Sequence, residues 1–277
     1  MATKFFGTIS LVLIILAAPA AVADPFATTI YDSSGLVEGY DATTTLGSPT
    51  TSVYDSWEAA DMDISMVYGA WGTDNVALFA PGGYVIVQFD TPVVNNPLNP
   101  YGADFIIFGN SAFLGQAGWV QADTDMASYA IAEGGAAFGV DAMSVSVSAN
   151  GDDWLTFTSP LAGGLWPTQA YSAWDAQAGA WDHNSPADFT LPMNPNLTPE
   201  QFGGLTAVEA LALYGGSGGG MAFDIGQLGL DEISFIRVDG PGVIDAFAKV
   251  SPVPEPATAA ILLLGAAGIL IRRRNRK

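Results

Sequence analysis

Short apolar runs separated by turn residues occupy the middle of the chain and predict β-strands. Met143–Ser148 alternates apolar and hydroxyl side chains with a period of two, which is typical of a half-buried strand. Asn150-Gly151 follows, and this pair favours a tight hairpin turn into a returning strand. The other runs are bounded by Gly, Pro, Asp or Asn, which favour turns. We predict strands at residues 84–89, 103–108, 143–148, 154–157, 233–238 and 243–250.

A single segment has a convincing helical pattern. Residues 205–214 are rich in Leu and Ala, and Gly215-Gly216 ends the segment. Residues 24–80 and 111–140 give few firm elements, and residues 57–63 fit either one helical turn or an acidic loop. Strands joined by short turns, with few helices and no alternation of strand and helix, predict a mainly β fold. We expect an antiparallel β-sandwich or jelly roll with one short helix.

Four phrases in a fixed order carry a resemblance to a known fold. They are residues 81–89, 103–110 and 145–154, followed by 235–239 ahead of 244–247. This succession resembles the strands of bacterial surface domains with a galactose-binding-like jelly roll. The resemblance implies a fold that commonly binds sugars and often carries a structural calcium ion. Because unrelated functions share one fold, it does not establish a ligand.

The first 23 residues have the layout of a secretory signal peptide. Lys4 precedes an apolar core at residues 9–18, which predicts a signal helix. Ala21-Val22-Ala23 is a small-x-small site and predicts cleavage between Ala23 and Asp24. The alternative is a permanent N-terminal anchor. We predict an exported domain over residues 24–251.

A proline-rich hinge, an apolar segment and a cationic end make up residues 252–277. As a helix, residues 257–271 reach roughly 22 Å, against ~30 Å for a bilayer core, so they predict a marginal membrane span. The terminal arginines favour a cytoplasmic C-terminus. Pro254, Glu255 and Pro256, ahead of this segment, resemble the PEP-CTERM sorting signal of bacterial surface proteins. The resemblance implies an exosortase-type protease as partner, removal of the apolar tail and delivery to the cell surface.

The exported domain is strongly acidic. It holds 27 of the 28 acidic residues but only Arg237 and Lys249 of the eight basic ones, which gives a net charge of −25. We exclude nucleic acid as a partner because phosphate contacts need cationic side chains. Bound cations can offset such a charge, and calcium is the usual hard cation for oxygen ligands outside cells. The chain has no cysteine, which excludes disulfides and thiol nucleophiles.

Three acids, Asp104, Asp224 and Asp245, lie within apolar, strand-like runs. A buried carboxylate is costly unless it is paired, hydrogen-bonded or bound to a metal, and the domain has few cations to pair with. We therefore predict a calcium site near Asp245 with Asp104 or Asp224. The alternative is that these acids accept backbone N–H groups at strand ends or lie on exposed alternate positions.

The loop at residues 160–188 is rich in aromatic residues. Trp166, Tyr171, Trp174 and Trp181 offer flat apolar faces beside polar side chains, a combination that suits sugar rings. The alternative is that these residues pin the long loop to the core.

We therefore predict a non-catalytic surface or matrix component that binds polysaccharide, calcium or both. One alternative is a glycoside hydrolase, which needs two carboxyl groups about 5 to 10 Å apart in one cleft. The second alternative is a structural coat protein without a small ligand. Exposed coplanar tryptophans favour polysaccharide binding, and two facing acids in a cleft favour the hydrolase.

Overall fold

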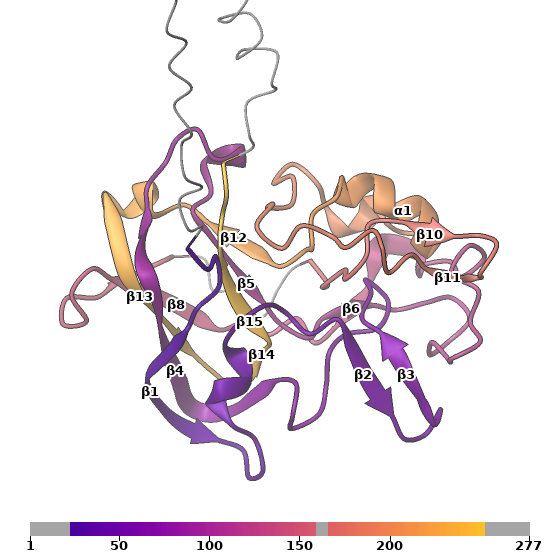
Figure 1. Cartoon of the computed structure of the whole chain (residues 1–277), viewed down its shortest axis with the longest axis horizontal. Helices are drawn as coiled ribbons and strands as arrows, with labels where there is room; N and C mark the ends of the chain where they lie inside the picture. The colour runs from indigo at the N-terminus through magenta and orange to yellow at the C-terminus, as the bar shows by residue number, and fades with distance from the viewer. Residues whose placement is uncertain (1–22, 159–165, 253–277) are drawn as a thin grey trace, which may run out of the picture.

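The computed structural model describes residues 23–158 and 166–252. The predicted signal helix, the sorting tripeptide Pro254–Pro256 and the apolar segment 257–271 lie outside these residues. Within them the fold is mainly β, with antiparallel sheets and one α-helix, as the sequence predicts (Figure 1).

The elements follow one another along the described chain as short strands and single helical turns. The strands are β1 (Thr29–Leu36), β2 (Ser52–Asp55), β3 (Ala60–Asp63), β4 (Ala77–Val94), β5 (Phe105–Phe108), β6 (Ala112–Phe113), β7 (Ala137–Phe138), β8 (Ser144–Ser148), β9 (Leu155–Thr156), β10 (Trp174–Asp175), β11 (Ala180–Trp181), β12 (Met221–Phe223), β13 (Glu232–Asp239), β14 (Gly242–Ile244) and β15 (Ala246–Lys249). The helices are α1 (Ala207–Tyr214) and the 3-10 turns η1 (Ala42–Thr45), η2 (Pro100–Gly102), η3 (Glu133–Gly135), η4 (Pro199–Gln201) and η5 (Ile225–Leu228).

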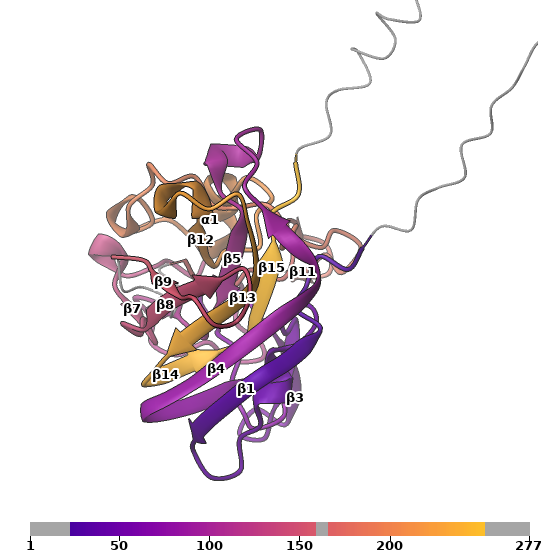
Figure 2. The same cartoon turned by 90° about the vertical axis from the view of Figure 1, so that its left-hand side faces the viewer.

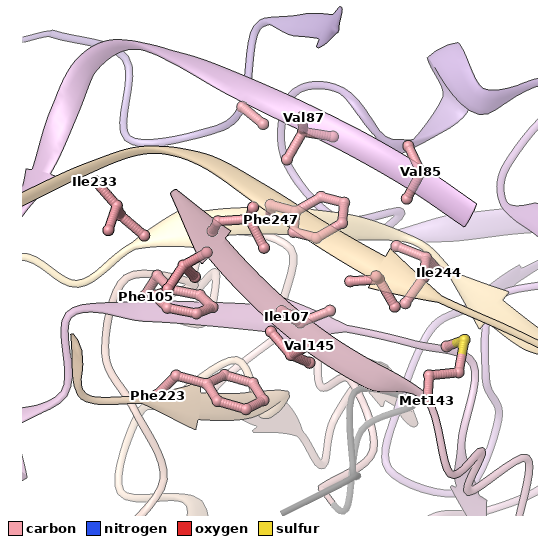
Figure 3. Close-up of a cluster of buried hydrophobic side chains, with 14 of the residues drawn as sticks. Val85, Val87, Phe105, Ile107, Met143, Val145, Phe223, Ile233, Ile244 and Phe247 are labelled. Atoms are coloured by element: carbon pink, nitrogen blue, oxygen red, sulfur yellow. The ribbon is translucent and has the colours of Figure 1, made fainter. Parts of the chain in front are cut away.

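Two antiparallel sheets pack against each other in a sandwich-like arrangement. The larger sheet has the order β1-β4-β13-β8-β9, with β14 also paired to β4, and the smaller has the order β12-β5-β15. Figure 2 views the molecule from the side of the larger sheet. Buried apolar side chains from both sheets form one core, shown in Figure 3, which includes Val85, Val87, Phe105, Ile107, Val145, Phe223 and Phe247.

Strand β5 is covered on both faces. Its four residues, Phe105–Phe108, are all fully buried, and alternate members point into the sandwich core and into a smaller cluster on the opposite side. A continuous apolar run is what a strand with two buried faces requires.

A second lobe of loops, the β2–β3 hairpin and α1 surrounds its own apolar core. Helix α1 begins at Thr206, whose hydroxyl accepts from the backbone N–H of Glu209 while the Glu209 carboxylate accepts from that of Thr206. It ends at Gly215, whose left-handed φ of 59° suits glycine. The lobe core joins α1 to the hairpin through residues such as Met62, Ile131, Phe202 and Ala210.

The predicted strand 243–250 is in fact two strands that belong to different sheets. β14 pairs with β4 in the larger sheet, and β15 pairs with β5 in the smaller one. Asp245 lies between them, fully buried, with both carboxylate oxygens turned to Thr50. The chain passes from the larger sheet to the smaller one at Asp245. The apolar pattern of the sequence continues across this residue, so the break between the two strands is not visible in the sequence.

The segment 57–63, predicted as a helical turn or an acidic loop, is instead part of a β-hairpin. Residues 56–59 form the turn of a hairpin, and residues 60–63 form β3, which pairs with β2. Alternation in β2, where Val53 and Asp55 are buried and their neighbours exposed, sets the register of this hairpin.

Candidate functional site

A groove of about 650 Å³ lies beside the β2–β3 hairpin. Three of the seven tryptophans line it, and Trp57, Trp71 and Trp119 are 91%, 37% and 74% exposed. We call it the tryptophan groove; its other lining residues are Asp55, Glu58, Val67, Tyr68, Gly69, Ala70, Asn110, Val120 and Phe138. Aromatic surface grouped in this way on a folded domain marks a contact site.

Asp55 shapes the hairpin turn that carries Trp57. Its Oδ1 atom accepts hydrogen bonds from the backbone N–H of Trp57 at 2.7 Å and of Glu58 at 3.3 Å. Aspartate commonly fixes a turn in this way, because its short side chain reaches the backbone two or three residues on. The Trp57 ring is therefore presented to solvent by a turn whose backbone is held in place.

The same carboxylate fixes a second tryptophan through Tyr68. The Tyr68 hydroxyl donates to Asp55 Oδ2 at 2.8 Å and accepts from the Trp71 ring N–H at 2.9 Å. Partial burial raises the pKa of Tyr68 to about 12, and the hydrogen bond from Tyr68 holds the pKa of Asp55 below its usual value. At neutral pH the phenol therefore remains a donor and the carboxylate an acceptor.

Trp119 is held from the other side of the groove. Its ring packs edge-on against Phe138 of β7, with 5.3 Å between the ring centroids. Glu58 Oε2 accepts from the backbone N–H of Ala122 at 3.1 Å, which ties the hairpin turn to the segment after Trp119. The turn that carries Trp57 and the rings of Trp71 and Trp119 are thus held by contacts made before any ligand arrives, and such preorganisation lowers the entropic cost of binding.

Gly69 brings two segments of the groove into close approach. A Cβ atom at this position would lie 2.3 Å from the carbonyl oxygen of Asn110. Only glycine lets the segment after β3 lie this close to the end of β5. Asn110 also lines the groove, and its side-chain oxygen is buried without a hydrogen-bond partner among the described residues.

The three predicted calcium ligands do not come together. Asp104 precedes β5 and Asp224 follows β12, so these two are neighbours, whereas Asp245 lies at the other end of the β5–β15 pair. Four strand residues separate the two ends, a distance on the order of 15 Å. In residues 23–158 and 166–252 no group of three or more metal-ligating side chains is close enough to hold an ion. Calcium binding by the protein stays a prediction, but these three residues do not form one shared site.

All three aspartates accept backbone N–H groups beside strand ends, and Asp224 accepts from that of Gly226 at 2.8 Å. Asp104 accepts from the N–H groups of Asn96 at 3.0 Å and Ile225 at 3.0 Å. Asp245 accepts from the N–H of Thr50, and from its hydroxyl at 2.8 Å. Burial raises the pKa of Asp104, and it raises the pKa of Asp245 to about 7.

The predicted aromatic loop packs largely inward. Trp166 and Trp181 are each 5% exposed and belong to the core of the second lobe. Trp174 packs edge-on against Trp181 at 5.3 Å, and Tyr171 stacks on His183 at 4.5 Å. These are the contacts of residues that pin a loop, and Trp166 and Trp181 present no open face to a sugar ring.

The exposed tryptophans lie in the parts of the sequence that gave no firm elements. Trp57, Trp71 and Trp119 are separated by long loops, so their spacing carries no motif. The available signal was local: Asp55-Ser-Trp57 places an aspartate two residues before a tryptophan, a pattern typical of a capped turn.

One comparison with known proteins identifies a segment of the chain. The family model of the PEP-CTERM protein-sorting motif matches residues 252–275. The chain carries a PEP-CTERM sorting motif. None of the curated proteins and none of the solved structures matches the chain.

The sorting motif indicates an exported protein that is directed to the cell surface. It implies processing by an exosortase and membrane association through the C-terminal tail, as the sequence predicts. In the part of the chain that the structure describes, no helix is long and apolar enough to cross a membrane.

Proposed function

We propose that this surface-sorted protein binds extracellular polysaccharide at the tryptophan groove and acts there without catalysis. The observation that carries the proposal is the grouping of Trp57, Trp71 and Trp119 around one groove, with fixed acceptors between them. Flat aromatic faces suit the apolar faces of sugar rings, and a few fixed polar groups suit their hydroxyls. The galactose-binding-like jelly roll expected from the sequence remains part of this proposal.

The position of the groove fits a protein that is tethered by its tail. In Figures 1 and 2, β15, the last strand before the sorting motif in the sequence, runs toward the upper end of the molecule. The β2–β3 hairpin lies at the lower right of the same view. A ligand in the extracellular matrix therefore meets the groove on a part of the domain away from the tether.

The carboxylates of the groove support a role in shape and recognition. Asp55 accepts three hydrogen bonds from its own chain, and Glu58 accepts one. A glycosidase needs a carboxyl group free to transfer a proton or attack the sugar. The atoms of Asp55 are already engaged in holding Trp57 and Tyr68.

Affinity electrophoresis of the full-length protein in mild detergent, through gels that contain single polysaccharides, tests the proposal. We expect retardation by at least one polymer, and Trp57→Ala and Trp119→Ala should each weaken the affinity about two- to tenfold, since stacking on an aromatic face is commonly worth about 0.5–1.5 kcal/mol. Trp154→Ala is the matched control, because Trp154 lies on the distant β8–β9 hairpin.

Two results would contradict the proposal. Retardation that survives both groove substitutions but is lost in Trp174→Ala would transfer the site to the aromatic loop. The release of new reducing ends from a retarding polymer, abolished by Glu58→Gln, would favour the hydrolase.

A further inference from the structure

The charged groups around the tryptophan groove are all of one sign. Asp55 and Glu58 line it, and no lysine or arginine of the described residues does. Of the two cations in the described domain, Arg237 is bound to Asp239 at 2.6 Å, and Lys249 donates to the Thr91 hydroxyl at 2.7 Å. Both cations lie in strands of the two sheets, so neither is available to a ligand in the groove.

Asp55 keeps its charge at neutral pH. The hydrogen bond from Tyr68 lowers the pKa of Asp55, and this carboxylate is held by the turn and cannot swing away. Glu58 has one oxygen bound to the backbone of Ala122, and its Oε1 accepts no hydrogen bond from the described residues. The groove therefore offers a fixed negative charge and an open acceptor.

We propose that the groove selects uncharged glycans and rejects acidic ones; this inference rests on the proposed polysaccharide-binding function. The hydroxyls of a neutral sugar donate hydrogen bonds, and carboxylates only accept them. A uronate or a sulfate ester brings further acceptors and a negative charge, so acceptors face acceptors in the groove. Like charges placed together at an interface are strongly unfavourable, and the charge of −25 on the domain adds a long-range repulsion.

Polymers that share a backbone and differ in charge provide the test. Suitable pairs are hydroxyethyl and carboxymethyl cellulose, dextran and carboxymethyl dextran, and starch and carboxymethyl starch. With the full-length protein in mild detergent, we expect the neutral member of the bound pair to be favoured by about tenfold or more at low salt. The preference should decrease as salt is added, because salt screens exposed charges.

Two single-charge variants separate a local effect from the overall charge. Glu58→Gln removes one of the two negative charges at the groove and should narrow the ratio of the affinities for the two polymers by about threefold or more. Asp152→Asn removes one exposed charge on the β8–β9 hairpin and should leave the ratio unchanged.

Different experimental results would overturn the selectivity for neutral glycans and the proposed polysaccharide binding. Binding of the acidic member as tight as that of the neutral member, and sensitive to Trp57→Ala, would overturn the selectivity alone. An equal effect of Glu58→Gln and Asp152→Asn on the ratio would also overturn it. The absence of binding to every polymer would overturn the proposed function on which the inference rests.

Discussion

Tyr68 donates a 2.8 Å hydrogen bond to Asp55, and this pair links the turn that carries Trp57 to the ring of Trp71. The two residues come from different segments, β2 and the loop after β3, and meet at the edge of the groove. One carboxylate thereby positions two exposed aromatic rings. The predictions below follow from this arrangement and from the buried residues that support the fold.

Tyr68→Phe keeps the ring and removes the hydroxyl that joins Asp55 to Trp71. A net hydrogen bond is worth a factor of roughly three to ten, so polysaccharide affinity should fall by about this much. Tyr54→Phe is the matched control, because Tyr54 lies beside Asp55 in β2, is 62% exposed and does not line the groove. Equal affinities for Tyr68→Phe and the unaltered protein, measured by titration calorimetry, would contradict the positioning role.

The same pair predicts that the stability of the folded protein depends on pH in the acidic range. Because the pKa of Asp55 is lowered in the folded state, its contribution to stability is present above the ordinary pKa of an aspartate. That contribution is lost as the pH falls through the lowered value. The difference in melting temperature between the unaltered protein and Asp55→Asn should therefore be constant from pH 5 to pH 8, and should shrink below about pH 4.

Gly69→Ala should destabilise the protein and distort the groove. The new methyl group would lie 2.3 Å from the Asn110 carbonyl oxygen, so one of the two segments must move. Such overpacking costs about 1–3 kcal/mol, measurable by urea unfolding. A Gly69→Ala variant as stable as the unaltered protein would contradict the close approach.

Asp245→Asn should be more stable than the unaltered protein at pH 8. The folded state raises the pKa of Asp245 to about 7, so it binds the proton more tightly than the unfolded chain does. The stability gained in this way is full below pH 3.8 and is lost as the pH rises through 7, at about 1.4 kcal/mol per pH unit between them. Thermal melts across this range should converge at low pH. The exposed Asp152→Asn serves as control, and a pH-independent difference would refute the prediction.

Trp181→Ala should destabilise the fold strongly, whereas Trp57→Ala should leave its stability nearly unchanged. Trp181 is 5% exposed within the core of the second lobe, so its truncation should cost about 3–5 kcal/mol. Trp57 is 91% exposed, and its truncation should change the free energy of unfolding by less than about 0.5 kcal/mol. Denaturant unfolding of both variants is the measurement. A large loss of stability in Trp57→Ala would show that this ring supports the fold.

The sorting motif predicts a shortened mature protein. Exosortase processing at residues 252–275 should remove the apolar segment and the arginine cluster. Mass spectrometry of protein recovered from the producing cells should therefore find a C-terminus before residue 257, where the apolar segment begins. An intact Lys277 in the recovered protein would contradict processing.

The sequence alone determined those features that depend on neighbouring residues. The alternation in Met143–Ser148 predicted β8, and Gly215-Gly216 predicted the end of α1. The sorting motif is also a local signal, since a tripeptide, an apolar segment and arginines follow one another directly. The negative charge of the exported domain is also set by the sequence alone, because it follows from the composition of residues 24–251, whose only basic residues are Arg237 and Lys249.

Only the tertiary structure decided which aromatic and acidic residues form a site. Trp166 and Trp181 have the same residue type as Trp57 and Trp119, yet packing buries the first two and leaves the others in solvent. The groove joins residues 55–58 to residue 119. Of the predicted calcium ligands, Asp104 and Asp245 lie at opposite ends of the β5–β15 pair, because these two strands run antiparallel. The burial of a side chain depends on contacts between distant segments, and a residue's own neighbours in the sequence do not specify those contacts.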